Sequence, residues 1–375
     1  MKKYKSYLLL VMVAFVFGTQ TMQAQSSYYI ITGKVLQEGT GQPLQAASVV
    51  AQQTTIGTAT DAEGRFRLAL PNGGYDVSVS FTGYQVMERR VNNTDAGQEI
   101  LFELSPKEKE LTAVSVVASG ELKNGWEKYG SFFLDEFIGK TENSRQCRIL
   151  NTQDLKFYFS RKRNRLKVMA DVPLEVQNEA LGYTIKYTLD SFVHEYASGV
   201  SLFTGYPVFE EMKTDSTNIK AQWKLRRELA YEGSILHFMR ALYSRSLDDE
   251  GFDVQVMTKA GNRDTALRAK DPYALLGYHK NDSLNTVSIQ PQSPDIAVIY
   301  TIEKPAIAYI KGNPGQPKDI QFSVIGFLSK DPVTIEQNGF YYEQSDIILR
   351  NYWTWEKIAD MLPYDYIDTS AEATD

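Results

Sequence analysis

The stretch Thr60-Asp-Ala-Glu-Gly-Arg-Phe-Arg-Leu68 decides how the N-terminal part of the chain folds. Asp61 can accept hydrogen bonds from backbone N–H groups that follow it, and Gly64 can adopt a positive φ, so the Asp-x-x-Gly sequence predicts a tight hairpin turn. Side chains alternate along a strand, so Phe66 and Leu68 share one face of the outgoing strand and the two arginines share the other. The stretch therefore predicts a hairpin with one apolar face.

Short alternating segments surround this hairpin on both sides. They are residues 28–36, 46–51 and 75–81, and they are separated by turn sequences at residues 39–43 and 71–74. Closely spaced strands with Gly, Pro and Asn between them, and no helical period, are typical of an all-β unit. The first hundred residues are therefore expected to form a β-sandwich.

Four landmarks occur in order along this unit, and they carry a family resemblance. They are Gly33-Lys-Val, Gln42-Pro-Leu-x-x-Ala-Ser-Val, Thr60-Asp-x-x-Gly-x-Phe, and the strand 75–81 followed by Thr82-Gly-Tyr84. Residues 28–105 in this way resemble the carboxypeptidase regulatory-like domain, a seven-stranded transthyretin-like sandwich. The resemblance implies a non-catalytic companion domain, found beside zinc carboxypeptidases and at the head of many outer-membrane proteins of the Bacteroidetes type.

The sequence offers no sign of the catalytic chemistry that the family name suggests. Zinc carboxypeptidases bind their metal through His-x-x-Glu and a later His, and none of His194, His237 and His279 is followed by Glu at the third place. No Gly-x-Ser-x-Gly, glycine-rich phosphate loop or His-Glu-x-x-His is present either. We therefore expect no catalytic residue, no cofactor and no metal site.

Residues 1–25 have the layout of a secretory signal peptide. Three lysines precede an apolar run from Leu8 to Phe17, and small or polar residues lead to Ala24. The run is too short to span a membrane, which takes about 20 residues, and no later segment is a candidate. The only cysteine is Cys147, so lipid attachment at the cleavage point is not expected, and Cys147 is interpreted as a small buried residue. The expected location is the periplasm or the outer-membrane surface.

Charge argues against a nucleic-acid partner. Without the signal peptide the chain has 37 basic and 46 acidic residues, a net charge of −9.

A connector, residues 106–125, follows the sandwich. In transporters that carry the related domain, a similar segment receives a strand from TonB, so Val114, Val116 and Val117 are a candidate for β-augmentation. The alternative is an edge strand or a strand that bridges two domains.

Residues 126–366 are expected to form an α+β domain of unknown function, and residues 367–375 a disordered tail. Alternating segments at 155–159, 166–170, 182–189, 191–196 and 200–209 predict an antiparallel sheet. Residues 218–245 predict one long amphipathic helix, with Gly233 as a break or close contact. Its apolar face comprises Leu225, Leu229, Leu236, Met239 and Tyr243. The fold class as a whole is mainly β.

Exposed aromatic residues are the candidate contacts for a partner or ligand. Tyr84 follows the last strong strand of the sandwich, and Trp353 and Trp355 lie near the C-terminus. The two tryptophans could stack on a sugar, or they could fix the terminus to the core. We hypothesise a non-catalytic cell-envelope binding or scaffold protein that contacts a protein or glycan. The alternatives are a secreted peptidase or glycosidase, marked by a cleft joining a histidine to a carboxylate, and an accessory of a TonB-dependent system.

Overall fold

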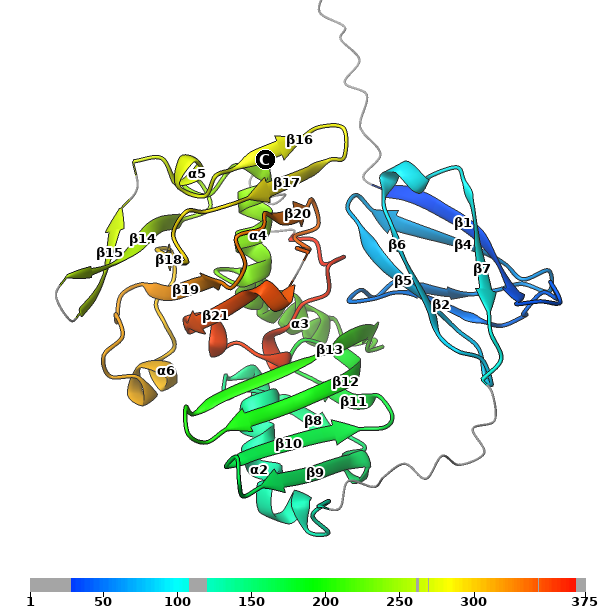
Figure 1. Cartoon of the computed structure of the whole chain (residues 1–375), viewed down its shortest axis with the longest axis horizontal. Helices are drawn as coiled ribbons and strands as arrows, with labels where there is room; N and C mark the ends of the chain where they lie inside the picture. The colour runs from blue at the N-terminus through cyan, green and yellow to red at the C-terminus, as the bar shows by residue number, and fades with distance from the viewer. Residues whose placement is uncertain (1–27, 108–119, 261–262, 269, 343, 369–375) are drawn as a thin grey trace, which may run out of the picture.

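The computed structural model describes residues 28–107, 120–260, 263–268, 270–342 and 344–368. Figure 1 shows three β-rich layers: a sandwich in blue and cyan, a sheet in green, and a further set of sheets in yellow and orange. The prediction of a mainly β protein is confirmed. The expected signal peptide, residues 108–119 of the connector with Val114, Val116 and Val117, and nearly all of the expected tail lie outside the described residues.

Residues 28–104 form seven strands in two sheets. The strands are β1 (Tyr28–Gln37), β2 (Ser48–Ala51), β3 (Gly57–Ala59), β4 (Arg65–Pro71), β5 (Tyr75–Ser80), β6 (Met87–Val91) and β7 (Glu99–Leu104). One sheet has the order β4-β1-β7 and the other β3-β2-β5-β6. Alternate residues of each strand face inward, and these apolar side chains form a single core between the sheets.

The turn before β4 forms as the sequence predicts. The Asp61 Oδ1 accepts hydrogen bonds from the backbone N–H groups of Glu63 and Arg65, at 3.0 and 2.8 Å. Gly64 has a φ of +74°, which favours glycine. Phe66 is buried while Arg65 is exposed, so the faces of β4 are also as predicted.

A six-stranded antiparallel sheet begins the second unit. Its strands are β8 (Cys147–Ile149), β9 (Leu155–Ser160), β10 (Arg165–Ala170), β11 (Leu174–Asn178), β12 (Tyr183–Glu195) and β13 (Val200–Glu211). Strand β12 pairs with β11 and β10 along one side and with β13 along the other, so β13 is an edge strand. Helix α2 (Gly125–Phe137) covers this sheet and buries Phe133 and Phe137 against it. The sequence analysis did not predict α2.

The remaining residues build two further sheets and several short helices. The five-stranded sheet has the order β15-β14-β18-β19-β21, and the three-stranded sheet has the order β16-β17-β20. Their strands are β14 (Phe252–Ala260), β15 (Arg263–Arg268), β16 (His279–Asn281), β17 (Thr286–Ile289), β18 (Asp295–Tyr300), β19 (Gln321–Phe327), β20 (Val333–Glu336) and β21 (Ile347–Asn351). The short helices of this part are α5 (Pro272–Leu275), α6 (Ile307–Gly312) and the 3-10 turns η4 (Gln344–Asp346), η5 (Tyr352–Thr354) and η6 (Ile358–Asp360). Three further 3-10 turns lie earlier in the chain: η1 (Asn93–Asp95) between β6 and β7, and η2 (Asn143–Gln146) and η3 (Thr152–Asp154) between α2 and β9.

Two expectations for the second unit are wrong in detail. A single antiparallel sheet was expected, but the unit has three sheets because its strands serve two separate cores. The expected long helix is two helices, α3 (Thr217–Tyr231) and α4 (Ile235–Ser244), because Gly233 at a φ of +72° breaks the chain and Ser234 caps α4. The break turns Leu225 and Leu229 into solvent, where they are 57% and 52% exposed.

Helix α3 is held on the green sheet by a close contact at Gly182. The Trp223 Nε1 donates to the Glu179 carbonyl at 2.9 Å, and the Arg227 guanidinium lies 3.9 Å from the centre of the Tyr183 ring. A Cβ atom on Gly182 would lie 2.2 Å from the Trp223 ring, and its φ is +70°. The position therefore requires both the conformation and the size of glycine.

We predict that Gly182→Ala lowers the free energy of unfolding by about 2–4 kcal/mol, from a strained backbone and an overpacked indole. Gly199→Ala is the matched control, because Gly199 has nearly the same φ, +69°, with nothing within 4 Å of its Cβ position. It should cost only about 1 kcal/mol. Urea unfolding measures both, and equal losses would show that the contact with Trp223 is unimportant.

Candidate binding site at the junction of the three layers

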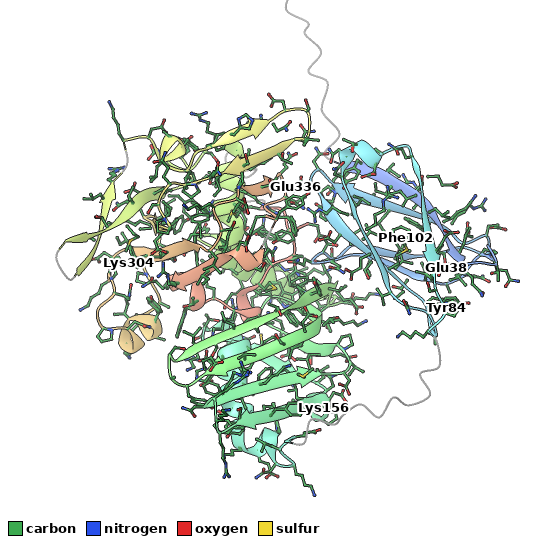
Figure 2. All side chains as sticks on the ribbon, in the orientation of Figure 1. Glu38, Tyr84, Phe102, Lys156, Lys304 and Glu336 are labelled. Atoms are coloured by element: carbon green, nitrogen blue, oxygen red, sulfur yellow. The ribbon has the colours of Figure 1, made fainter. Side chains whose placement is uncertain are left out.

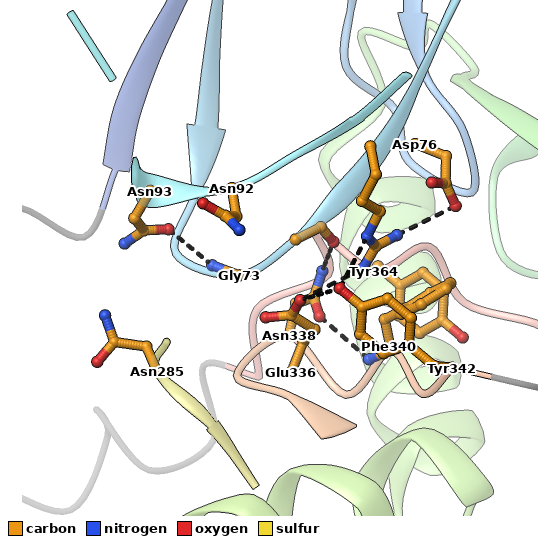
Figure 3. Close-up of polar contacts among 12 residues, drawn as sticks. Gly73, Asp76, Asn92, Asn93, Asn285, Glu336, Asn338, Phe340, Tyr342 and Tyr364 are labelled. Atoms are coloured by element: carbon orange, nitrogen blue, oxygen red, sulfur yellow. Dashed lines mark hydrogen bonds and ion pairs between the residues drawn. The ribbon is translucent and has the colours of Figure 1, made fainter. Parts of the chain in front are cut away.

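The β-sandwich contacts the second unit through Arg90 of β6. The guanidinium lies 3.1 Å from Asp76 in the sandwich and 3.7 Å from Glu336 in β20, and it stacks 3.8 Å from the centre of the Phe340 ring. Glu336 is only 3% exposed and also accepts a 2.7 Å hydrogen bond from the Tyr342 hydroxyl. Figure 3 shows these side chains gathered at the junction. Removing one partner of a buried ion pair of this kind is strongly destabilising, because the other charge is left buried and uncompensated.

Polar contacts extend this junction on both sides of Arg90. The Asn338 amide donates to the Gly74 carbonyl at 3.0 Å, and Gly73 leaves room for it, because a Cβ there would lie 2.8 Å from the Asn338 side chain. The Thr55 backbone N–H donates to Asp365 at 3.0 Å. In Figure 2 Glu336 lies on the side of the second unit that faces the sandwich.

The C-terminal segment, residues 352–366, bonds to all three layers. The Trp353 indole N–H donates to the Gly233 carbonyl at 2.7 Å, which fixes the segment beside α4. The Ala359 backbone bonds to Ile138 beyond α2 and accepts from the buried Asn178 amide. The Tyr364 N–H then donates to the Gln53 carbonyl of the sandwich at 2.8 Å.

A cavity of about 830 Å³ lies where these layers meet. Aromatic side chains from β12 and β13, from the loop after β20 and from the C-terminal segment line it, among them Phe203, Tyr206, Tyr341, Trp353 and Tyr364. Cavities of this size, with mostly apolar walls and a few polar groups, are typical of small-molecule or peptide sites.

Two acidic residues of the C-terminal segment, Glu356 and Asp360, are among those that line this cavity. Burial raises the pKa of Glu356 well above its usual range, and the nearby negative charges of Asp360 and Glu303 raise it further. Burial also raises the pKa of Asp360 to about 6, although hydrogen bonds from Thr141 and Asn143 oppose this. The Glu356 carboxyl makes no hydrogen bond or ion pair with any residue that the structure describes, although it lines the cavity.

The three candidate contact residues from the sequence do not form one site. Tyr84 is half-buried at the end of the sandwich away from the second unit, and its hydroxyl donates to Gln37. Trp353 is 5% exposed and packs on Phe238, so its place fits the interpretation that it fixes the terminus to the core. Trp355 packs against Tyr309, outside the lining of the cavity.

His237 lies beside a carboxylate in a second hollow, of about 510 Å³. Its Nδ1 accepts from the Gly233 backbone N–H at 3.2 Å, so Nε2 carries the proton and donates to Glu250, also at 3.2 Å. Burial lowers the pKa of His237, against the effect of Glu250. The ring is 6% exposed because α4 packs that side onto Phe252.

The other histidines and the cysteine occupy structural positions. The His194 Nδ1 lies 2.8 Å from the Ser201 hydroxyl, and burial lowers its pKa. His279 begins strand β16 on the surface. Burial raises the pKa of the half-buried Cys147 thiol to about 12, which suits an inert thiol. Within the described ranges, no group of three His, Cys, Asp or Glu side chains could hold a metal ion.

Sequence reasoning missed Arg90, Glu336, Glu356 and Asp360. Glu336 ends a short strand, after Ile335 and before Gln337, and nothing in this local sequence indicates a buried charge. Glu356 and Asp360 are four residues apart, as neighbours on an α-helix are, but no α-helix forms there. Helical periodicity therefore could not indicate that they are close. Their proximity depends on the layers that the C-terminal segment crosses.

We predict that Arg90→Met lowers the free energy of unfolding by about 3–5 kcal/mol, because it leaves the buried Glu336 carboxylate without its cation. Adding Glu336→Gln should recover much of this loss, so the two changes are not additive. Arg65→Met, at the exposed ion pair with Glu63, is the control and should behave as an ordinary surface change. Additive losses in a urea-unfolding cycle would contradict the coupling.

We predict a pH-dependent stability gain for Asp360→Asn. The folded wild type holds a proton on Asp360 up to about pH 6, whereas the usual carboxyl pKa is 3.8, so wild-type stability from this group falls as pH rises through that window. An Asn Oδ1 can still accept from Thr141 and Asn143. From pH 4 to pH 7, the free energy of unfolding of the variant should therefore rise by about 2 kcal/mol relative to that of the wild type. A difference in unfolding free energy between variant and wild type that stays constant over this pH range would contradict the prediction.

Comparison with known proteins identifies the N-terminal unit. Residues 31–116 match the family model of the CarboxypepD_reg-like domain. The TonB-dependent receptor SusC of Bacteroides thetaiotaomicron is 39% identical over 80 residues, which are 21% of this chain and 8% of the receptor. A 9R-lipoxygenase from Cyanothece shares 9% identity over 63% of this chain and 51% of its own, with a TM-score of 0.16, and so carries no argument. Residues 31–116 are therefore a CarboxypepD_reg-like domain, also similar to part of that receptor.

Proposed function

We propose that the protein is a non-catalytic cell-envelope binding protein that takes its ligand in the 830 Å³ cavity. The observation that carries the proposal is the cavity itself, with aromatic walls and the unpaired carboxyl of Glu356 inside. A half-buried carboxyl without a hydrogen-bond partner loses hydration that the protein does not replace, and a bound ligand that hydrogen-bonds to it would offset that cost.

The sandwich supports a binding role by closing one side of this cavity. Gln53, Asp76 and Arg90 of the sandwich line it together with residues of the second unit. In this arrangement the regulatory-like domain acts through protein contact, with Arg90 fixing its position. The proposal includes a wider role, in which the protein is a scaffold that contacts an envelope protein or a glycan.

The proposed location rests on two observations. The N-terminal 25 residues have the layout of a signal peptide, and the CarboxypepD_reg-like domain is similar to a segment of a TonB-dependent receptor. No helix in the described part of the chain is long and apolar enough to cross a membrane. A role as an accessory of a TonB-dependent system is a second proposal, supported by the same similarity.

A hydrolase is the competing class, and the His237–Glu250 pair is the observation that favours it. The pair lies in a hollow, as a catalytic site would. Both ring nitrogens are already engaged, however, because Nδ1 accepts from Gly233 and Nε2 donates to Glu250. A general base needs a free nitrogen within reach of the proton that it removes. This geometry supports a structural histidine and leaves binding as the better proposal.

We predict that Thr204→Trp blocks ligand binding. Thr204 lines the cavity from the exposed side of β13, so an indole there fills part of the space without entering a core. Ser198→Trp, on the exposed turn before β13, is the matched control. Calorimetric titration of the full mature chain with panels of neutral oligosaccharides and short peptides should find a ligand. Thr204→Trp should weaken its binding at least about tenfold, and Ser198→Trp should not. If no panel member binds, or both variants bind equally, the proposal is wrong.

A further inference from the structure

The edge strand β13 passes along the cavity with part of its backbone unpaired. Its residues from Phe203 to Pro207 line the cavity, and Figure 1 shows β13 at the side of its sheet that lies nearest β21. Strand β13 is paired with β12 along one of its two edges. The opposite edge is the kind of backbone surface to which an extended chain can add.

The sandwich already uses the C-terminal end of this edge. The Gln53 N–H donates to the Pro207 carbonyl at 2.8 Å, and the Phe209 N–H donates to the Thr54 carbonyl at 3.0 Å. These bonds show that the backbone N–H and C=O groups of the odd-numbered residues of β13 point away from β12. By the alternation of an antiparallel strand, the backbone groups of Phe203 and Gly205 point the same way. Neither forms a backbone hydrogen bond to any other described residue on that side.

The charges of the cavity favour a cationic ligand. Of the described residues that line it, two are basic and both are engaged: Arg90 with Asp76 and Glu336, and Lys357 with Glu136 at 3.2 Å. Among its acidic residues, Asp190 and Glu356 form no ion pair with a described residue. A cation beside these carboxyl groups favours their ionised form, and the faces of the aromatic rings attract it as well.

We infer that the ligand of this cavity is an extended peptide that adds as a strand to the free edge of β13 and places a basic side chain beside Glu356. This inference rests on the proposed binding function and names its ligand class. The site continues an interface that is already formed, because the peptide would extend along β13 from the point where Gln53 and Thr54 leave it. The main chain provides affinity and Glu356 provides selectivity for a cation.

The test uses an end-blocked pentapeptide, Thr-Val-Lys-Val-Thr, with the unmodified mature chain. Two analogues are methylated on backbone nitrogens, one on the second and fourth residues and the other on the first, third and fifth. In a strand, one alternate set of N–H groups faces β13 and the other faces solvent. One analogue should therefore lose at least about tenfold in affinity, while the other should bind nearly as well as the parent. Exchange of the Phe203 and Gly205 amide protons should slow when the parent peptide binds.

Selectivity is tested with Glu356→Gln and a peptide that has norleucine in place of the central lysine. Glu356→Gln should weaken the lysine peptide at least about tenfold and leave the norleucine peptide unchanged. Glu127→Gln, on the exposed side of α2, is the control and should change neither. Equal effects of the two methylated analogues would overturn strand addition, and an unchanged affinity of Glu356→Gln for the lysine peptide would overturn the role of Glu356.

The outcomes separate this inference from the proposed function. If neutral oligosaccharides bind and Thr204→Trp blocks them, while no peptide binds, the cavity is a binding site and the peptide inference is wrong. If neither peptides nor oligosaccharides bind, the proposed function fails as well. Support requires peptide binding, the alternating effect of methylation and the loss with Glu356→Gln.

Discussion

The hydrogen bonds of the C-terminal segment hold the three layers in one arrangement. Within about fifteen residues, this segment bonds to Gly233 beside α4, to Ile138 beyond α2 and to Gln53 in the sandwich. Each layer has its own apolar core, so the cores alone do not determine how the layers meet. The segment and the Arg90–Glu336 ion pair set that geometry, and the cavity is the space that they leave.

Local patterns predicted local structure well. The Asp61–Gly64 turn, the faces of β4 and the hairpin of β9 and β10 all depend on residues that are close in the sequence, and the structure has them. One long helix was predicted, with Gly233 as a break or a close contact within it, because a periodic pattern does not show how a positive φ redirects the chain. Helix α2 was missed because its phenylalanines and glycines resemble strand and turn signals as much as helical ones.

The cavity could not be predicted from sequence, for a physical reason. Thr55 and Asp365 are 310 residues apart in the chain, and Arg90 and Tyr342 are 252 apart. Contacts at such separations depend on complete packed layers, and a single sequence contains no local signal for them. Glu356 gains its raised pKa only from what surrounds it in three dimensions. The exposed aromatic residues that the sequence does suggest, by contrast, are mostly engaged in packing.

The position of the joining segment also bears on the order of folding. A chain that emerges from its N-terminus can complete the sandwich early, because the strands of that unit lie within the first 104 residues. The green sheet can follow, but the layers cannot be fixed together until residues 352–366 are present. Until then Arg90 and the edge of β13 are exposed to solvent and to neighbouring chains. The slow step of folding is therefore expected to be the final docking of these layers, and a chaperone would protect the protein most during that interval.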